Sequence, residues 1–154
     1  MKTTHNKIFS LAGLLLLLSV SAFAQRSPVS WSFRADKVEG DTYQLVFTAD
    51  VDNGWYIYSQ HLDEGGPIPT SISFEESEHF ELLGETGEEA RKRKEGMDEL
   101  FGMNVIKFGE QAVFTQRIRV EDPSQPVKGS LEFMTCDDEQ CLPPQTVPFE
   151  ITLE

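Results

Sequence analysis

The sequence predicts an all-β domain with an immunoglobulin-like β-sandwich fold. Apolar and polar residues alternate with a period of two over much of the chain, which is typical of strands that bury one face. Turn signals such as Glu39-Gly40-Asp41 and Asp52-Asn53-Gly54 separate these segments. The segments are short and number eight or nine, as expected for two packed sheets.

Each predicted strand follows from the spacing of its apolar residues. Trp31 and Phe33 alternate with polar neighbours, as do Tyr43, Leu45 and Phe47. In chain order, the predicted strands cover residues 29–33, 43–51, 55–59, 70–74, 80–83, 112–120, 127–133 and 147–153.

Residues 84–96 interrupt the alternation, because they are densely charged. The sequence predicts a short helix or a mobile loop for this segment. It contains the basic run 91–94, Arg-Lys-Arg-Lys. This run is either a handle for an acidic partner or a solvated connection of mixed charge.

The first 24 residues have the pattern of a signal peptide cleaved after Ala24. Lys2 and Lys7 precede an apolar stretch at residues 8–20, which is shorter than the roughly 18 residues that span a bilayer. We therefore expect an exported, periplasmic chain of residues 25–154 forming one domain. Disulfides persist in such a compartment.

Composition excludes several functions. The chain has 26 Asp and Glu against 13 Lys and Arg, and its formal charge of −13 becomes −15 after signal cleavage. Such a charge argues against nucleic-acid binding and against direct membrane binding after cleavage. With two Cys and three His, no zinc site and no cysteine–histidine hydrolase is expected. The sequence predicts no metal and no cofactor.

Cys136 and Cys141 are separated by four residues, between two predicted strands. If these strands pair as a hairpin, the two residues face each other and can form a disulfide. A structural bridge is one interpretation. However, closing a loop of about six residues stabilises a fold by only about 2 kcal/mol. The position on a loop, followed by Leu142 and two prolines, instead favours an accessible, working pair with Cys141 as the more exposed sulfur.

Three segments resemble one known family. The segment FMTCDDEQCLPP at residues 133–144 resembles the active-site segment of the N-terminal periplasmic domain of the thiol:disulfide interchange protein DsbD family. In the same order along the chain, GWYIYS at 54–59 is similar to the aromatic strand of that family, and DELFG at 98–102 is similar to its cap loop.

The resemblance implies a thiol:disulfide oxidoreductase of the protein-disulfide reductase type, active in the electron transfer that serves disulfide reduction and cytochrome c biogenesis. Cys141 would form mixed disulfides with partners and Cys136 would resolve them. The cap loop would shield the pair, with Asp98 and Glu99 near enough to tune the thiols. The remaining implied site residues are Leu100, Phe101 and Gly102 of the cap loop and the supporting residues Tyr56, Tyr58, Leu142, Pro143 and Pro144.

The resemblance also implies partners. These are thioredoxin-fold periplasmic proteins as electron acceptors and a membrane-embedded thiol reductant as donor. Because the sequence ends at Glu154, we expect the donor to be a separate polypeptide. The alternative is a non-redox exported binding module with a structural disulfide, whose negative charge would select a basic partner.

Overall fold

The computed structural model describes residues 27–153. Within this range the regular secondary structure consists of β-strands, with no helix. The predicted signal peptide, residues 1–24, lies outside the described residues. The all-β prediction is confirmed. The strands are β1 (Val29–Glu39), β2 (Thr42–Val51), β3 (Tyr56–Tyr58), β4 (Ser71–Phe74), β5 (Phe80–Asp98), β6 (Met103–Val120), β7 (Val127–Phe133), β8 (Thr135–Cys136) and β9 (Gln145–Ile151).

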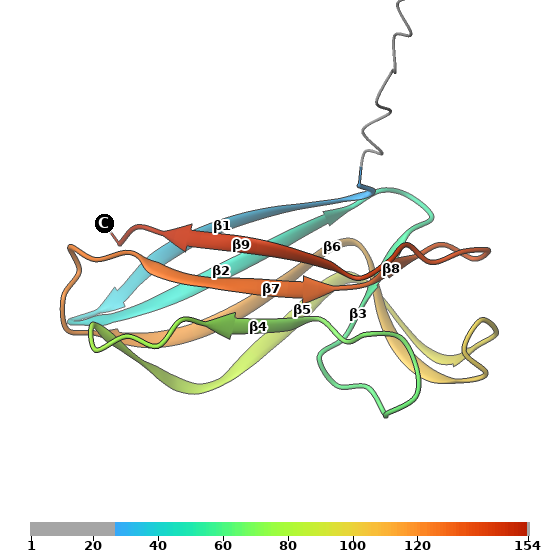
Figure 1. Ribbon diagram of the computed structural model, residues 1–154, viewed down its shortest axis with the longest axis horizontal. Coiled ribbons are helices and arrows are strands. Elements are labelled where there is room, and N and C mark those ends of the chain that lie inside the picture. Colours follow the sequence, from blue (N-terminus) through green and yellow to red (C-terminus); the bar gives the residue numbers. More distant parts are fainter. Residues whose placement is uncertain (1–26, 154) are drawn as a thin grey trace, which may run out of the picture.

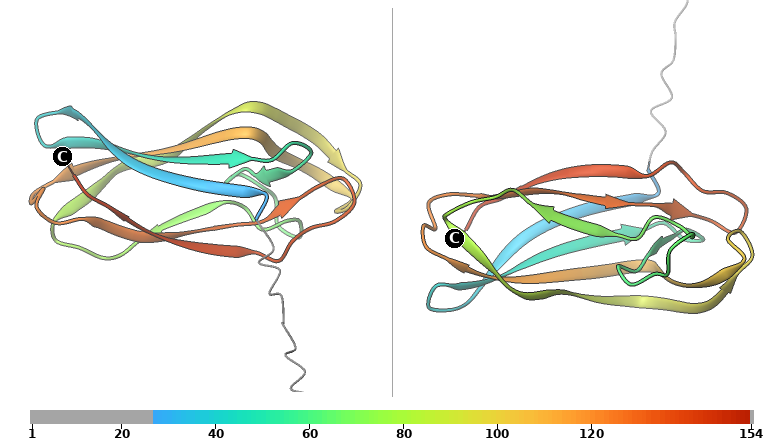
Figure 2. Two further views of the ribbon diagram at one scale, coloured as in Figure 1. Left: turned by 90° about the horizontal axis from the view of Figure 1, so that it is seen from above. Right: turned by 60° about the horizontal axis from the view of Figure 1, so that its bottom comes forward.

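The strands form two sheets that lie face to face (Figures 1 and 2). The larger sheet has six strands in the order β1-β2-β6-β3-β8, with β5 on the other edge of β6, and the smaller sheet has the order β4-β7-β9. Long β6 pairs with β2 over its second half and with β3 over its first half, at Phe108 and Lys107. It thereby connects the body of the sandwich to the end that carries the cysteines.

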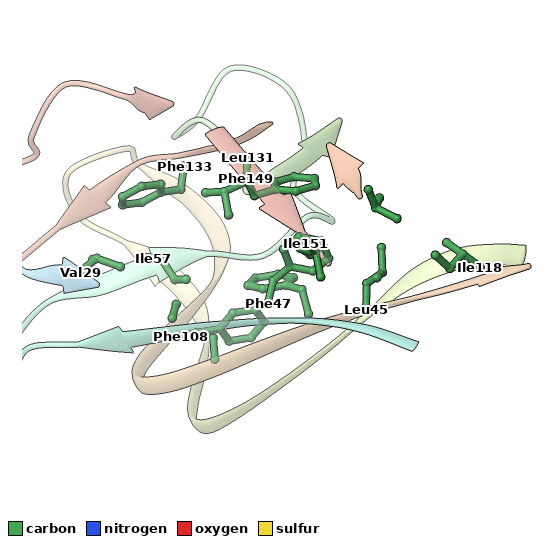
Figure 3. Close-up of a cluster of buried hydrophobic side chains, with 14 of the residues drawn as sticks. Val29, Leu45, Phe47, Ile57, Phe108, Ile118, Leu131, Phe133, Phe149 and Ile151 are labelled. Carbon is green, nitrogen blue, oxygen red and sulfur yellow. The ribbon is translucent and has the colours of Figure 1, made fainter. Parts of the chain in front are cut away.

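The main core fills the space between the two sheets. Phe149 of β9 is central, because its ring lies 5.0 Å from that of Phe47, 5.6 Å from that of Phe74 and 5.7 Å from that of Phe33. Figure 3 shows Phe47, Phe133 and Phe149 in this layer. These are among the alternating aromatic residues from which the sequence predicts the strands, and burial of apolar side chains in this layer drives folding.

Residues 84–96 are neither a helix nor a loop, so that prediction is wrong. They belong to β5, which pairs with β6 from Phe80 opposite Val120 to Asp98 opposite Met103. Polar contacts replace apolar burial here: Glu88 accepts hydrogen bonds from the Ser59 hydroxyl at 2.5 Å and from the Gln60 amide at 2.9 Å. The strand therefore depends on its partner β6 rather than on an apolar face of its own.

Three connections gather at one end of the sandwich, on the right in Figure 1. They are the β5–β6 turn, the loop between β3 and β4, and the segment from β8 to β9. Within residues 27–153, no helix has the length and apolar character of a membrane span.

Candidate functional site

The two cysteines lie in a small hairpin that changes sheets. The chain leaves the smaller sheet after β7, and β8 joins the larger sheet beside β3, where Cys136 pairs with Tyr56. Cys136 and Cys141 then face each other as an isolated antiparallel bridge. The Asp137 amide donates to the Gln140 carbonyl, and the Leu142 amide donates to the Thr135 carbonyl, both at 2.9 Å. Because these bonds flank the cysteines, the pair occupies a non-hydrogen-bonded position, where side chains approach most closely.

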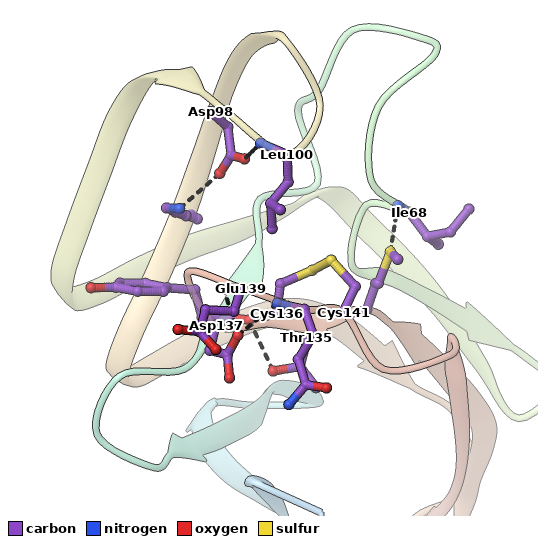
Figure 4. The surroundings of a disulfide bond; sticks show 12 residues. Ile68, Asp98, Leu100, Thr135, Cys136, Asp137, Glu139 and Cys141 are labelled. Atoms are coloured by element: carbon purple, nitrogen blue, oxygen red, sulfur yellow. Dashed lines mark hydrogen bonds and ion pairs between the residues drawn. A yellow bond between two sulfur atoms is a disulfide. The ribbon is translucent and has the colours of Figure 1, made fainter.

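Cys136 and Cys141 are joined by a disulfide, with their Cα atoms 4.0 Å apart (Figure 4). The predicted pairing across a hairpin is therefore present in the structure. The two residues differ in exposure. Cys136 is 1% exposed, whereas Cys141 is half-buried and followed by the exposed Pro143 and Pro144. A partner can approach Cys141 more easily than Cys136.

The acidic tip of this hairpin stabilises its own turn. One carboxylate oxygen of Asp137 accepts hydrogen bonds from the Glu139 and Gln140 amides, both at 2.8 Å. These two bonds hold the pKa of the Asp137 carboxyl below its usual value. Asp138 and Glu139 extend into solvent, where salt screens their effect on the cysteines.

The disulfide belongs to a small apolar cluster separate from the main core. Its buried members are Tyr58, Val105 and Cys136. Half-buried side chains that pack against them are Leu62, Phe101, Met103, Met134 and Cys141. The sulfurs are thus surrounded by apolar and polarisable groups at the end of the sandwich.

Tyr58 lies at the centre of this cluster. Its side chain is fully buried, and the Phe101 ring packs edge-on against it with centroids 5.9 Å apart. Burial, reinforced by the negative charge of Asp98, raises the pKa of the Tyr58 phenol far above its usual value. Its hydroxyl has no hydrogen-bond partner among residues 27–153.

Residues 98–102 form the turn between β5 and β6, and we call them the cap loop. Phe101 reaches into the disulfide cluster, as described above. Leu100 is 44% exposed, and its side chain points toward the disulfide in Figure 4. Gly102 has a φ of +64°, which favours glycine, and Glu99 is exposed. A cleft of about 290 Å³ separates the cap loop from the hairpin tip at Asp137 and Asp138.

Asp98 is buried, and its carboxylate is fully engaged at the base of the cap loop. One carboxylate oxygen accepts a hydrogen bond from the Leu100 amide at 3.0 Å, and the other pairs with Lys107 Nζ at 2.7 Å. The backbone carbonyl of Asp98 accepts from the Gly102 amide at 2.7 Å. The structure therefore gives Asp98 a part in shaping the loop.

Tyr56 is 4% exposed, pairs with Cys136 across the sheet and lies beneath three lysines. The ammonium groups of Lys94, Lys107 and Lys92 lie 4.6, 4.9 and 5.4 Å from its ring centroid. The ring packs flat on Gly109, where an added Cβ would lie 3.0 Å from Cε1 of the ring. Contact with the Lys94 ammonium group lowers the pKa of the Tyr56 phenol and raises that of Lys94.

The structure brings the predicted site residues to one end of the molecule, with Leu142 and both prolines beside Cys141. Sequence reasoning missed Lys107 and Val105, and it gave no separate role to Met134 of the 133–144 segment. Lys107 and Val105 become neighbours of the site only through strand register, which no local sequence signal reveals.

Within residues 27–153, no three His, Cys, Asp or Glu side chains gather as they would to hold a metal ion.

An immunoglobulin-like β-sandwich with a disulfide in an end loop, covered by a second loop, is consistent with a thiol–disulfide exchange domain. The sequence matches the family described as "Thiol:disulfide interchange protein DsbD, N-terminal" over residues 24–153. The chain belongs to this family, as its three motifs indicate. No match was found among curated proteins.

Two solved structures resemble this fold. The N-terminal domain of Neisseria meningitidis DsbD in its reduced form has a TM-score of 0.54 at 17% identity, and the match covers 81% of this chain and 85% of that chain. The N-terminal periplasmic domain of ScsB from Proteus mirabilis has a TM-score of 0.54 at 15% identity, with 81% of this chain and 45% of that chain covered. These similarities support the immunoglobulin-like β-sandwich and show no more than the fold.

Proposed function

We propose that this chain is an exported thiol:disulfide oxidoreductase domain, cleaved after Ala24 and active in the periplasm. It takes reducing equivalents from a separate membrane-embedded thiol reductant and passes them to periplasmic thioredoxin-fold proteins. The observation that carries this proposal is the unequal exposure of the disulfide. Cys136 is buried and Cys141 is half-buried, in a cluster separate from the main core.

The unequal exposure supports a division of labour in thiol–disulfide exchange. In the reduced protein, the Cys141 thiolate attacks a partner disulfide, forming a mixed disulfide and releasing the second partner sulfur as a thiolate. The Cys136 thiolate then attacks the Cys141 sulfur. This step re-forms the Cys136–Cys141 disulfide and releases the partner as a dithiol. Two electrons pass to the partner, and the membrane-embedded thiol reductant restores the reduced pair.

The cap loop has a protective part in this proposal. Phe101 of the cap loop packs against Tyr58, and Leu100 of the same loop points toward the disulfide. Both would have to move for a partner sulfur to reach Cys141 in line with the bond that breaks. The loop therefore admits a docked partner and slows reaction with other thiols.

Trapping of mixed disulfides tests the proposal. A Cys136→Ala variant, exported with its own leader, keeps Cys141 but cannot resolve the mixed disulfide. We expect it to accumulate reductant-sensitive adducts with thioredoxin-fold proteins on non-reducing gels. Cys141→Ala is the matched control, and we expect few adducts from it. Equal trapping by the two variants would contradict the assignment of Cys141 as the nucleophile.

The reduction potential separates this function from its alternative, a binding module with a structural bridge. We expect a potential above about −300 mV, because bridges that serve only stability lie below that value. A lower potential together with the absence of adducts from both variants would favour the structural bridge.

A further inference from the structure

Positive charge is concentrated beside the disulfide in a strongly acidic protein. Of the chain's 13 basic side chains, five lie on the disulfide half of the β5–β6 hairpin, although the formal net charge is −13. They are Arg91, Lys92, Arg93, Lys94 and Lys107. This concentration needs an explanation, because acidic side chains outnumber basic ones by 26 to 13 in the chain as a whole.

Three of these side chains share one face of the sheet, which we call the lysine face. Lys92 and Lys94 are two positions apart on β5, so their side chains lie on the same face of the sheet. Lys107 of β6 lies directly opposite Lys94. Their ammonium groups all lie within 5.4 Å of the centroid of the Tyr56 ring. Tyr56 is the pairing partner of Cys136, so the lysine face lies over the strand next to the disulfide.

Two of the three lysines form no ion pair within residues 27–153, although Asp138, after the larger effect of Tyr56, also lies near enough to Lys94 to raise its pKa. Lys107 pairs with Asp98, but neither Lys92 nor Lys94 has a carboxylate within 4.0 Å among residues 27–153. One ammonium group is enough for a cation–π contact with a tyrosine, as Lys37 makes with Tyr43 at 5.6 Å. Further ammonium groups over one ring repel each other, so shielding of Tyr56 does not account for them.

The surroundings of the lysine face resemble a protein interface. Met97 is 69% exposed and Leu100 is 44% exposed, so two large apolar side chains lie in solvent beside the basic groups. Lys94, Met97 and Lys107, among others, line a cleft of about 470 Å³. Apolar anchors with a charged rim are typical of docking surfaces. Asp137 and Asp138 of the hairpin tip line a neighbouring cleft together with Lys107, so the acidic tip borders the lysine face.

We propose that the lysine face is the docking surface that selects electron-transfer partners, and that it binds an acidic segment of the partner next to the partner's reactive cysteine. This inference rests on the proposed exchange function and adds partner choice to it. Charge complementarity at such a rim speeds encounter and orients the partner, more than it tightens the final complex. An anionic membrane is a poor occupant, because the net charge of the chain opposes it.

Charged disulfide probes test the proposal. Three peptides of equal length each carry one cysteine as a 2-thiopyridyl disulfide, flanked by Glu, Gln or Lys residues. A thiolate of the reduced protein attacks the peptide sulfur and releases 2-thiopyridone, which is followed by absorbance. The second cysteine then releases the peptide thiol and closes the Cys136–Cys141 disulfide. At low ionic strength we expect the Glu peptide to react about fivefold faster than the Gln peptide, and the difference to vanish in about 1 M salt.

Matched charge variants locate the effect. In Lys92→Gln/Lys94→Gln, we expect the ratio of the Glu-peptide rate to the Gln-peptide rate to fall to about one. The control is Lys37→Gln/Lys128→Gln, which removes the same charge. Lys37 lies over Tyr43 near the end of β1, and β1 ends on the left in Figure 1, away from the disulfide; Lys128 lies on β7. The control should keep the full preference for the Glu peptide.

The outcomes separate the two proposals. Equal rates for all three peptides with the unmodified protein would overturn the docking surface and leave the exchange function intact. An equal loss of preference in the control variant would also overturn it, because the effect would then come from net charge alone. Failure to reduce any of the peptides would contradict the exchange function instead.

Discussion

Asp98 organises the base of the cap loop through three contacts. Its carboxylate accepts from the Leu100 amide and pairs with Lys107, and its carbonyl accepts from the Gly102 amide. The side chains of the ion pair are 3% and 16% exposed, so each charge depends on the other for the solvation it has lost. The same lysine also lies over Tyr56. One pair of residues thus connects the loop over the disulfide to the strand beneath it.

The buried ion pair leads to a prediction about stability. Lys107→Met leaves the Asp98 carboxylate buried without its counter-ion, and we expect the free energy of unfolding to fall by about 3 kcal/mol. The matched control is Lys128→Met, which breaks the exposed pair of Lys128 with Glu150. It should cost less than about 0.5 kcal/mol. Urea unfolding of the two oxidised variants measures both values, and equal losses would contradict the role assigned to Lys107.

At the scale of elements, the cap loop is the turn of the β5–β6 hairpin. The part of this hairpin near the turn extends beyond the main core. The outer part of β5 is paired with β6 but has few buried apolar side chains of its own. Phe101 anchors this turn to the rest of the protein, because its ring packs on Tyr58. The loop is therefore held by a small number of contacts, as expected of a segment that opens more easily than the sheets.

Removing the Phe101 ring should make the disulfide easier to reach. The edge-on contact with Tyr58 is worth about 1 kcal/mol, so Phe101→Ala should speed reduction of the disulfide by dithiothreitol roughly fivefold. Leu82→Ala is the control, because Leu82 is 48% exposed on β5 at the end far from the cap loop. We expect no change in its rate. An unchanged rate in Phe101→Ala would contradict the shielding role of the loop.

Elements with alternating apolar residues could be predicted from the sequence, and so could the cysteine hairpin, because both depend on local patterns. The middle of β5 could not. Its half-buried positions are Thr86, Glu88, Ala90 and Lys92, which carry no apolar alternation, and pairing with β6 decides their structure. The sequence shows the basic run 91–94 but not the lysine face, because only strand register brings Lys107 opposite Lys94 across the β5–β6 turn.

At the scale of the whole molecule, one apolar cluster holds the two sheets together and a separate, smaller one surrounds the disulfide. The main core between the sheets contains Phe47, Phe133 and Phe149, and the disulfide belongs to the smaller cluster around Tyr58. A redox-active bridge must open and close without unfolding its protein. This arrangement meets that requirement, because neither cysteine belongs to the main core between the sheets.

The reduced protein should therefore stay folded. The bridge closes a loop of only about six residues, so chain entropy predicts that its loss lowers the free energy of unfolding by about 2 kcal/mol. We expect reduction to leave the circular dichroism spectrum unchanged and to shift urea unfolding by this small amount. Phe149→Ala, which opens a cavity in the main core, should cost more, about 3 kcal/mol or above, and calibrates the measurement. If reduction cost as much as this core variant, the bridge would be a structural support, and electron transfer through it would be coupled to unfolding.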